Sequence, residues 1–527
     1  MNPNQFQMKR IFFLLIFGMY QLSIYSQTIQ NVMITDYNLP NEPSIIVNPA
    51  NTQNIIVGEN SSSYYVSNDG GFTWERKTIT SNSGYGGDPS LDADMNGNIY
   101  FLHLSNTGGY SGWIDRIVCQ RSDDNGNTFT QDSYMGYNSP KKQDKQWSVI
   151  DHVNHKMYVT WTQFDAYGSS DSNKFSNIMF SKSDDNGATW SNAIQINDVS
   201  GDCVDSDNTV EGATPAVGPN GEVYVSWVGP AGLMFDKSTD GGQTWLPQDI
   251  MINDMQNSGG WDYDIPGINR CNGLPITKCD LSNSSYRGTI YVNWSDQRNG
   301  ADNTDIFLSK STDGGQTWSA PIKVNNDTGH KHQFLTWMDI DQTNGNLYFV
   351  FYDRRNYNDN NTDVYMAVST DGGETFSNKR ISANPFIPDG SHFFGDYTNL
   401  SAHNGVIRPA WTQMSTNSQS LWTAIVNHDD LLSMEKNTKN IVETNVYPVP
   451  NFDNISIKYK LINDTQLTIN LLDNNGRLIK TLIDNQFRKA GKNKEVFKND
   501  HIKLSAGIYF IELKTNDFRK LLKLIKD

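Results

Sequence analysis

Short runs of alternating or wholly apolar residues recur along the first 430 residues, and each run begins after a glycine or a polar turn. Their β-branched and aromatic composition predicts β-strands. The clearest runs are Gly97–Leu102, Lys156–Trp161, Glu222–Trp227, Thr289–Trp294 and Asn346–Phe351. The pattern therefore predicts an all-β fold.

One eight-residue motif punctuates these strands six times: Ser, any residue, Asp, any residue, Gly, any residue, Thr and an aromatic residue. Its aspartates, spaced by 55, 61, 55, 73 and 58 residues, are Asp69, Asp124, Asp185, Asp240, Asp313 and Asp371. The aspartate can accept hydrogen bonds from its own turn, the glycine permits a positive φ, and the aromatic ring fills the gap between neighbouring strands. We therefore interpret all six aspartates as structural.

Seven sets of three strands flank these motifs. They begin near Pro43, Pro89, Trp147, Pro215, Pro275, Phe334 and Tyr397. The last set has no motif after it, and the segment Thr28–Thr35 is free to supply its fourth strand. Closing a ring in this way hides the edges that an open sheet exposes.

The motif resembles the Asp-box (BNR) repeat of sialidases and related β-propellers, over most of residues 40–430. This resemblance implies a propeller with its boxes on the outer strands, away from the active site. The strand sets favour seven blades, whereas sialidases themselves have six, and six blades are the alternative.

The last 83 residues differ from the rest. After a polar linker come the segment Tyr447–Asn451, short strands, and a basic final strand at Arg519–Lys526. This part resembles the C-terminal sorting domain of the type IX (Por) secretion system of Bacteroidetes, a small β-sandwich. The alternative is a carbohydrate-binding or immunoglobulin-like accessory module.

Charge follows the same division. Residues 441–527 carry 15 Lys and Arg against 10 Asp and Glu, whereas residues 1–440 carry 27 against 48, so a net charge of +5 adjoins one of -21. The 12% aromatic and 19% charged residues exclude a disordered chain, and the acidity disfavours a nucleic-acid partner.

The N-terminus indicates export. Lys9 and Arg10 precede an apolar run that is too short to span a bilayer, and Ser26 is a small residue at a cleavage point. The predicted layout is a signal peptide at 1–26, a propeller at 27–430, a linker at 431–444 and the sorting domain at 445–527. We expect a secreted or outer-membrane-attached protein without a transmembrane segment.

Four cysteines, Cys119, Cys203, Cys271 and Cys279, follow the signal. They predict either disulfides, for which Cys271 and Cys279 are close enough in sequence, or buried thiols. No cysteine or histidine spacing indicates a metal site.

In a propeller, the first residues of the inner strands and the ends of the second strands meet at the mouth of a central funnel, where ligand sites concentrate. The inner-strand positions are Glu42, Asp88, Asp144, Glu211, Arg270, His332 and Asp396, and the second strands add Asp296, Arg298, Asp353, Arg354 and Arg355. Crowded carboxyl groups raise one another's pKa values and suit general acid catalysis, whereas nearby arginines keep others ionised. An alternative is that Asp353 and Arg355 form an inter-blade ion pair with a structural role.

The sialidase resemblance implies three arginines on a substrate carboxylate and a tyrosine nucleophile supported by a glutamate. The candidate catalytic residues are Asp353, Asp396, Glu211, Tyr397 and Asp88, and the candidate substrate-binding residues are Arg270, Arg298, Arg354, His332, Trp113 and Trp261. We expect a glycoside hydrolase acting on acidic glycans, with a polysaccharide lyase as a close variant.

The other class of function is a non-catalytic propeller that binds glycan or protein, holds Ca²⁺ in its acidic mouth and stacks Trp113 and Trp261 on sugar. The sequence establishes no cofactor, and Ca²⁺ is the candidate ion. The expected partners are a glycan and the type IX secretion machinery.

Overall fold

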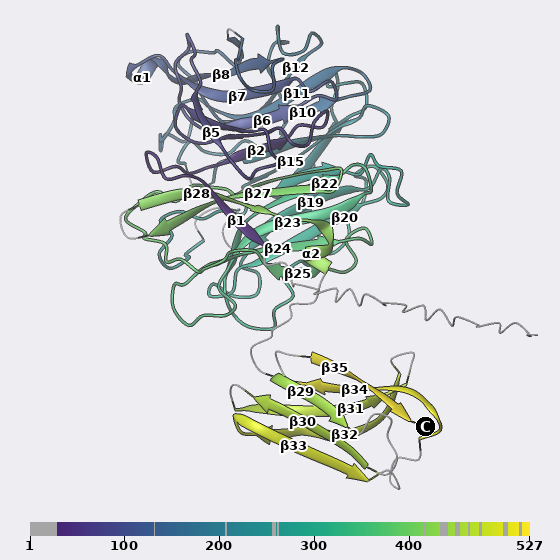
Figure 1. Ribbon diagram of the computed structural model, residues 1–527. Helices are drawn as coiled ribbons and strands as arrows, with labels where there is room; N and C mark the ends of the chain where they lie inside the picture. Colours follow the sequence, from purple (N-terminus) through teal and green to yellow (C-terminus); the bar gives the residue numbers. More distant parts are fainter. Residues whose placement is uncertain are drawn as a thin grey trace, which may run out of the picture. The chain divides into compact units, whose positions relative to one another are not determined.

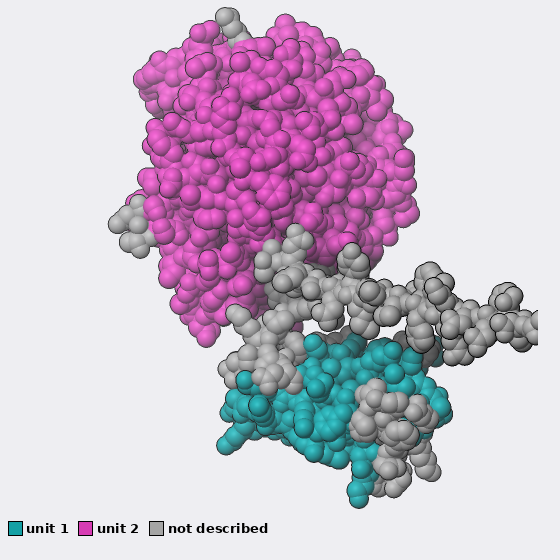
Figure 2. Space-filling model, in the orientation of Figure 1, with its two compact units in different colours: residues 1–28, 435–527 teal, residues 29–434 magenta. Residues whose placement is uncertain are grey.

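The computed structural model describes residues 29–130, 132–205, 208–255, 260, 263–415, 418–432, 441–447, 454–461, 464–473, 477–498, 504–515 and 519–526. The chain divides into two compact units, one at Ile29–Met434 and one that contains Glu435–Asp527 (Figures 1 and 2). The predicted signal peptide at 1–26 lies outside the described residues. No helix in the described part is long and apolar enough to cross a membrane.

The described residues of the first unit form seven four-stranded antiparallel sheets. The first sheet comprises β2 (Ser44–Val47), β3 (Ile55–Gly58), β4 (Ser63–Ser67) and β5 (Glu75–Thr78). The second comprises β6 (Ser90–Ala93), β7 (Ile99–Asn106), β8 (Trp113–Ser122) and β9 (Ser133–Met135). The third comprises β10 (Lys142–Asp151), β11 (Lys156–Phe164), β12 (Ser176–Ser183) and β13 (Ile194–Gln195). Sheets four and five comprise β14 (Glu211–Val217), β15 (Val223–Gly229), β16 (Gly232–Ser238) and β17 (Ile250–Asn253); β18 (Ile276–Cys279), β19 (Ile290–Asp296), β20 (Asp305–Ser311) and β21 (Ile322–Lys323). Sheets six and seven comprise β22 (Gln333–Asp341), β23 (Asn346–Asp353), β24 (Asp363–Ser369) and β25 (Ser377–Arg380); β26 (Asn399–His403), β27 (Val406–Ser415), β28 (Ser418–Ile425) and β1 (Gln30–Thr35). The two short helices are α1 (Gly109–Gly112) and α2 (His428–Leu432).

The sheets are arranged as the blades of a propeller, which confirms the predicted fold class. The innermost strands contact one another in the cyclic order β2, β6, β10, β14, β18, β22, β26 and back to β2. The N-terminal strand β1 pairs antiparallel with β28, with Gln30 opposite Ile425. The last sheet thus takes its outer strand from the N-terminal part of the chain. This is the role predicted for the segment Thr28–Thr35.

Each Asp-box lies in the turn between the third and fourth strands of its sheet. In the fourth copy, Asp240 accepts hydrogen bonds from Ser238 Oγ at 2.7 Å, Thr244 N at 2.9 Å and Thr244 Oγ1 at 2.6 Å. The Trp245 ring packs edge-on against Phe180 of the preceding sheet, with 5.0 Å between ring centroids. Gly242 has a φ of +82°, and a Cβ there would lie 2.2 Å from the Phe180 ring, so only glycine fits.

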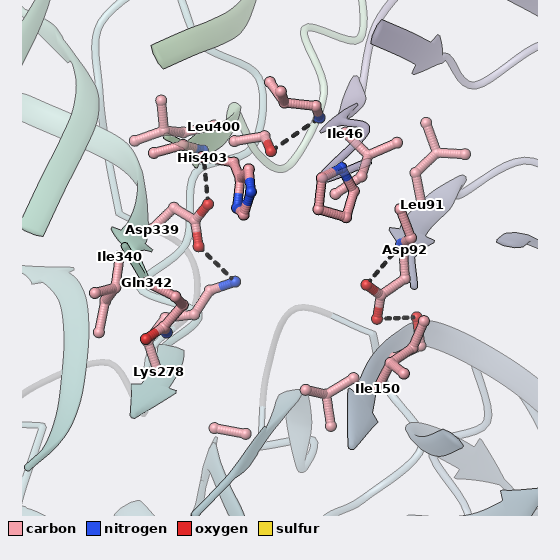
Figure 3. A pocket seen from close by; sticks show the side chains of 18 of the residues that line it. Ile46, Leu91, Asp92, Ile150, Lys278, Asp339, Ile340, Gln342, Leu400 and His403 are labelled. Atoms are coloured by element: carbon pink, nitrogen blue, oxygen red, sulfur yellow. Dashed lines mark hydrogen bonds and ion pairs between the residues drawn. The ribbon is translucent and has the colours of Figure 1, made fainter. Parts of the chain in front are cut away.

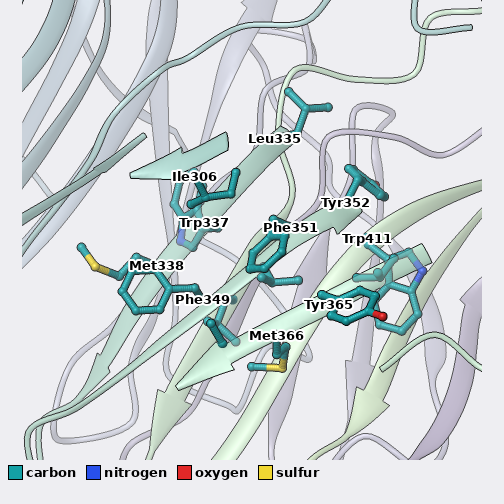
Figure 4. Packing of buried hydrophobic residues seen from close by; sticks show 14 of the residues in the cluster. Ile306, Leu335, Trp337, Met338, Phe349, Phe351, Tyr352, Tyr365, Met366 and Trp411 are labelled. Atoms are coloured by element: carbon teal, nitrogen blue, oxygen red, sulfur yellow. The ribbon is translucent and has the colours of Figure 1, made fainter. Parts of the chain in front are cut away.

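The core consists of apolar layers between adjacent sheets. Trp161, Trp227, Trp294 and Trp411 stand on the second strands of four sheets and are fully buried. Figure 4 shows the packing around the sixth sheet, where Phe351 of β23 and Tyr365 of the paired strand β24 stack with 6.4 Å between ring centroids. All four cysteines are buried and free, so no disulfide joins Cys271 to Cys279 and the buried-thiol alternative holds.

The C-terminal unit is a sandwich of two sheets, which confirms the predicted β-sandwich. One sheet has the order β29-β30-β33 and the other β32-β31-β34-β35. Their strands are β29 (Ile441–Tyr447), β30 (Asn454–Leu461), β31 (Thr465–Leu472), β32 (Leu478–Arg488), β33 (Gly491–Lys498), β34 (Gly507–Lys514) and β35 (Arg519–Lys526). Buried residues of both sheets, Ile457 and Leu471 among them, form one apolar core.

Candidate functional site

The residues at the heads of the inner strands adopt an unusual backbone conformation. Glu42, Asp88 and Lys145 have φ values of 49°, 50° and 52°, in the left-handed region that disfavours side chains. The fourth and seventh sheets place Gly212 and Gly395 at the corresponding bends, with φ values of 72° and 105°. Such conformations in residues other than glycine cost about 1–3 kcal/mol each and concentrate at functional sites.

These bends bring a buried ionic cluster together. Lys145 Nζ lies 2.8 Å from Asp396 Oδ2 and 3.5 Å from Asp88 Oδ2. Arg270 donates from Nε to Asp396 Oδ1 at 2.8 Å and forms a second bond to the same carboxylate. Its Nη1 donates to Asp205 Oδ2 at 2.8 Å. The lysine and Asp396 are almost completely buried, whereas the side chains of Arg270 and Asp205 are 22% and 17% exposed and form the accessible edge.

Six carboxyl groups share two cations in this cluster, namely Glu42, Asp88, Asp144, Asp205, Glu211 and Asp396. The excess of acid shifts the pKa values of five of them, in two opposite directions. Burial, together with the negative charge of neighbouring carboxylates, raises the pKa values of Glu42, Asp144 and Glu211 well above their ordinary values.

Two members are held as anions instead. Burial opposes the ionisation of Asp88, but the Lys145 ammonium and hydrogen bonds from Asp144 and Glu42 lower its pKa. Burial likewise opposes the ionisation of Asp396, and the charges of Lys145 and Arg270 lower its pKa. Neighbouring carboxyl groups whose pKa values move in opposite directions are the arrangement from which acid and base roles arise.

Glu211 is the exceptional member. It is fully buried, and neither carboxyl oxygen has a hydrogen-bond partner in the described part of the chain. A buried polar group without a partner costs about 1–3 kcal/mol. The charges that act on its pKa come from Asp205, Asp144, Lys145 and Arg270, which places the carboxyl group beside the accessible edge.

Aromatic rings enclose the cluster. Tyr167 donates its hydroxyl hydrogen to Asp205 Oδ2 at 2.7 Å. Tyr397 is buried, and burial together with Asp88 and Glu42 raises the pKa of its hydroxyl well above the usual value, so it stays neutral. Its ring contacts the ring of Trp147, with 5.2 Å between centroids.

A central channel opens at the other end of the inner strands. Trp147 and Trp337 line both a small cavity that reaches Asp396 and a larger cavity of about 230 Å³. Figure 3 shows that larger cavity, with Asp92 facing the ion pair of Lys278 and Asp339 across the opening. The two tryptophan rings separate the ionic cluster from the channel.

The structure gathers some of the predicted site residues and not others. Glu42, Asp88, Asp144, Glu211, Arg270 and Asp396 meet in the cluster. The sequence pattern did not predict that Lys145, Asp205 and Tyr167 belong to the site. Lys145 directly follows Asp144 but reaches the centre only because a bulge in β10 interrupts the alternation of the strand between Asp144 and Trp147.

The charged residues at the ends of the second strands form local pairs. Arg355 Nη2 lies 2.6 Å from the buried Asp353 carboxylate, and Arg298 Nε lies 2.8 Å from Asp296 Oδ1. These pairs repeat the same two-residue spacing in neighbouring sheets. Asp353 and Arg355 thus form an ion pair, but the pair joins neighbours at the end of one strand, β23, rather than two blades as the sequence alternative predicted.

The remaining candidates lie apart from one another. Arg354 is buried and donates from Nε to Thr362 Oγ1 at 3.0 Å, so Arg270, Arg298 and Arg354 have separate partners. His332 lies beside Thr304, and burial followed by the charge of Arg354 lowers its pKa to about 4.

Of the two tryptophans predicted to stack on sugar, Trp113 lies within the described residues. Trp113 is half-buried, and its ring packs against Tyr167 with 5.1 Å between centroids. Trp261 lies outside the described residues. Within the described residues, no three His, Cys, Asp or Glu side chains are arranged to hold a metal ion.

Comparison with known proteins assigns the C-terminal unit. Residues 445–527 match the family described as the Secretion system C-terminal sorting domain. The type IX pathway therefore exports the protein to the cell surface or the extracellular space. No curated protein sequence matches the chain.

Several solved structures are similar to the chain. A polysaccharide lyase of family PL25, an ulvan lyase, is 14% identical, with 74% of this chain and 95% of the lyase covered and a TM-score of 0.45. The NanB sialidase from Streptococcus pneumoniae is 10% identical, with 72% and 84% covered and a TM-score of 0.43. An α-L-arabinanase from Penicillium chrysogenum is 14% identical, with 65% and 98% covered and a TM-score of 0.39. None of these similarities indicates an activity for this chain.

Proposed function

We propose that the protein is an exported glycan-active enzyme of the glycoside hydrolase type, and that the ionic cluster around Lys145 is its catalytic centre. One observation carries the proposal: Glu211 is a buried carboxyl group with no hydrogen-bond partner among the described residues, and it lies beside the partly exposed Asp205 and Arg270. A carboxyl group with a raised pKa next to an ion-paired carboxylate is what glycoside hydrolysis requires.

The roles follow from burial and charge. Glu211, whose pKa is raised by burial and by the charges of Asp205 and Asp144, donates its proton to the glycosidic oxygen of the leaving sugar. Asp205, the accessible carboxylate, serves as the base or the nucleophile. Arg270 presents the accessible cation and suits the carboxylate of an acidic sugar. Lys145 positions Asp396, and Asp396 in turn fixes Arg270 through two hydrogen bonds.

This assignment differs from the sialidase pattern in its nucleophile. Burial and the negative charges of Asp88, Glu42 and Asp396 raise the pKa of the Tyr397 hydroxyl well above its usual value. A neutral, buried hydroxyl is a poor nucleophile. We therefore assign the chemistry to the carboxyl groups and a packing role to Tyr397.

The test is to incubate the mature protein with sialylated and uronic-acid-containing glycans, with and without EDTA. New reducing ends indicate hydrolysis, whereas unsaturated products would identify the lyase variant. Glu211→Gln should reduce turnover by at least a hundredfold, while Asp353→Asn, in a local ion pair, should retain more than a tenth of the wild-type rate. The proposal fails if Glu211→Gln keeps full activity, or if glycans bind without any product.

A further inference from the structure

A groove lies on the outer side of the first unit, between the second and third sheets. It has a volume of about 350 Å³, within the range of small-ligand sites. Its walls come from β9 and the segment that follows it, from β11 and β12, and from the segment before β13. The lining residues are Tyr134, Met135, Gly136, Tyr137, Asn138, Gln163, Met179, Trp190, Ser191, Asn192 and Ala193.

None of these lining residues is charged, although residues 1–440 carry a net charge of -21. The lining combines aromatic rings with amide and hydroxyl groups. Such a surface suits a ligand with apolar C–H faces and many hydroxyl groups, because rings pack against the faces and amides exchange hydrogen bonds with the hydroxyls. An uncharged oligosaccharide has this chemistry.

The aromatic rings of the groove are exposed and yet held in place. Tyr134 and Tyr137 are 50% and 54% exposed, and their rings stand at 81° to each other. The Arg116 guanidinium lies 4.9 Å and 4.1 Å from the two ring centroids. Arg116 is itself fixed by two hydrogen bonds to Asp115, of 2.8 Å and 2.9 Å, so its charge is neutralised locally.

Rings fixed before binding lose little conformational freedom when a ligand arrives, which favours affinity. On the opposite wall, Trp190 Nε1 donates to Ser133 Oγ at 3.1 Å, which fixes the indole. Gly136 has a φ of +72°, and a Cβ there would lie 3.0 Å from the Trp161 ring, so the glycine lets this segment lie close against the sheet.

We propose that this groove, which we call the seam groove, binds a segment of an uncharged polysaccharide. Tyr134 and Tyr137 stack on the sugar rings, and the exposed amides of Asn138 and Asn192 bind the hydroxyls. The seam groove is separate from the ionic cluster, so the proposal does not rest on the catalytic assignment. A binding site outside the centre holds the protein on its polymer.

Affinity electrophoresis of the mature protein in gels that contain laminarin, xylan, arabinan or dextran tests the proposal. At least one of these uncharged polymers should retard the wild type. The double variant Tyr134→Ala/Tyr137→Ala should weaken that retardation at least tenfold with an unchanged melting temperature, and Asn192→Asp should weaken it as well. Glu211→Gln should bind like the wild type, which separates the seam groove from the catalytic proposal.

Tyr37→Ala is the matched control. Tyr37 is 53% exposed and also lies under an arginine, with Arg76 at 4.0 Å from its ring centroid, but it is not part of the groove. Removal of the Tyr37 ring should leave polysaccharide binding unchanged. The proposal is overturned if no uncharged polymer retards the wild type, if the double variant binds normally, or if the groove variants instead abolish binding to chondroitin sulfate, a charged polymer.

Discussion

Replacing Glu211 by glutamine tests whether its carboxyl group is catalytic or only structural. The substitution keeps the shape of the side chain and removes its ability to ionise. Because burial raises the pKa of Glu211, the folded state retains a proton that the unfolded state releases above about pH 4.5. Stability linked to this group is therefore lost as the pH rises towards the folded-state pKa, since the folded protein binds more protons.

The magnitude follows from this linkage. Wild-type protein should lose about 1.4 kcal/mol of unfolding free energy for each pH unit over which folded Glu211 stays protonated and unfolded Glu211 does not. Glutamine has no such dependence. The unpaired amide costs about 1–3 kcal/mol, but this cost is the same at every pH. The free energy of unfolding of Glu211→Gln, relative to that of the wild type, should therefore increase steadily from pH 5 upwards. Its turnover should be lost over the same range.

Urea unfolding of both proteins at pH 5, 6, 7 and 8 measures this difference. The control is Glu374→Gln, which removes an exposed glutamate paired with Lys310 and should give a curve parallel to the wild type. Parallel curves for Glu211→Gln and wild type would refute the assignment of a buried, protonated carboxyl group.

Three further results are expected. Lys145→Met leaves Asp88 and Asp396 buried without their lysine, so urea unfolding should show a loss of about 3–5 kcal/mol; a loss below 1 kcal/mol would contradict the central role of the lysine. Asp124→Ala removes three hydrogen bonds of an Asp-box turn, so stability should fall by about 1–3 kcal/mol with kcat unchanged, and a loss of turnover at equal folding would argue against a structural box. Deletion of residues 27–36 removes β1 and exposes the edge of β28, so the melting temperature should fall and aggregation, followed by light scattering, should increase; an unchanged melting temperature would show that the ring does not need this strand.

Much of the site could be predicted as a set of positions but not as a set of contacts. The strand pattern placed Glu42, Asp88 and Asp396 at the heads of inner strands, and a propeller brings such positions to one axis. The pattern could not show that Lys145 joins them, because a bulge changes which side of β10 its residues face. Nor could it show that Asp353 pairs with its own neighbour Arg355, since local ion pairs and catalytic carboxylates look alike in sequence.

The sequence by itself determined the periodic part of this protein: the strands, the six Asp-boxes, the closing N-terminal segment and the basic sandwich at the C-terminus. These features are local, because turn chemistry and alternation act within a few residues. Only the tertiary structure decided which charges are buried together. In the part of the chain that the structure describes, Glu211 has no hydrogen-bond partner, whereas Asp396 pairs with two cations. Electrostatic environment depends on residues that are distant in sequence, such as Lys145 and Arg270, and packing alone brings them within reach.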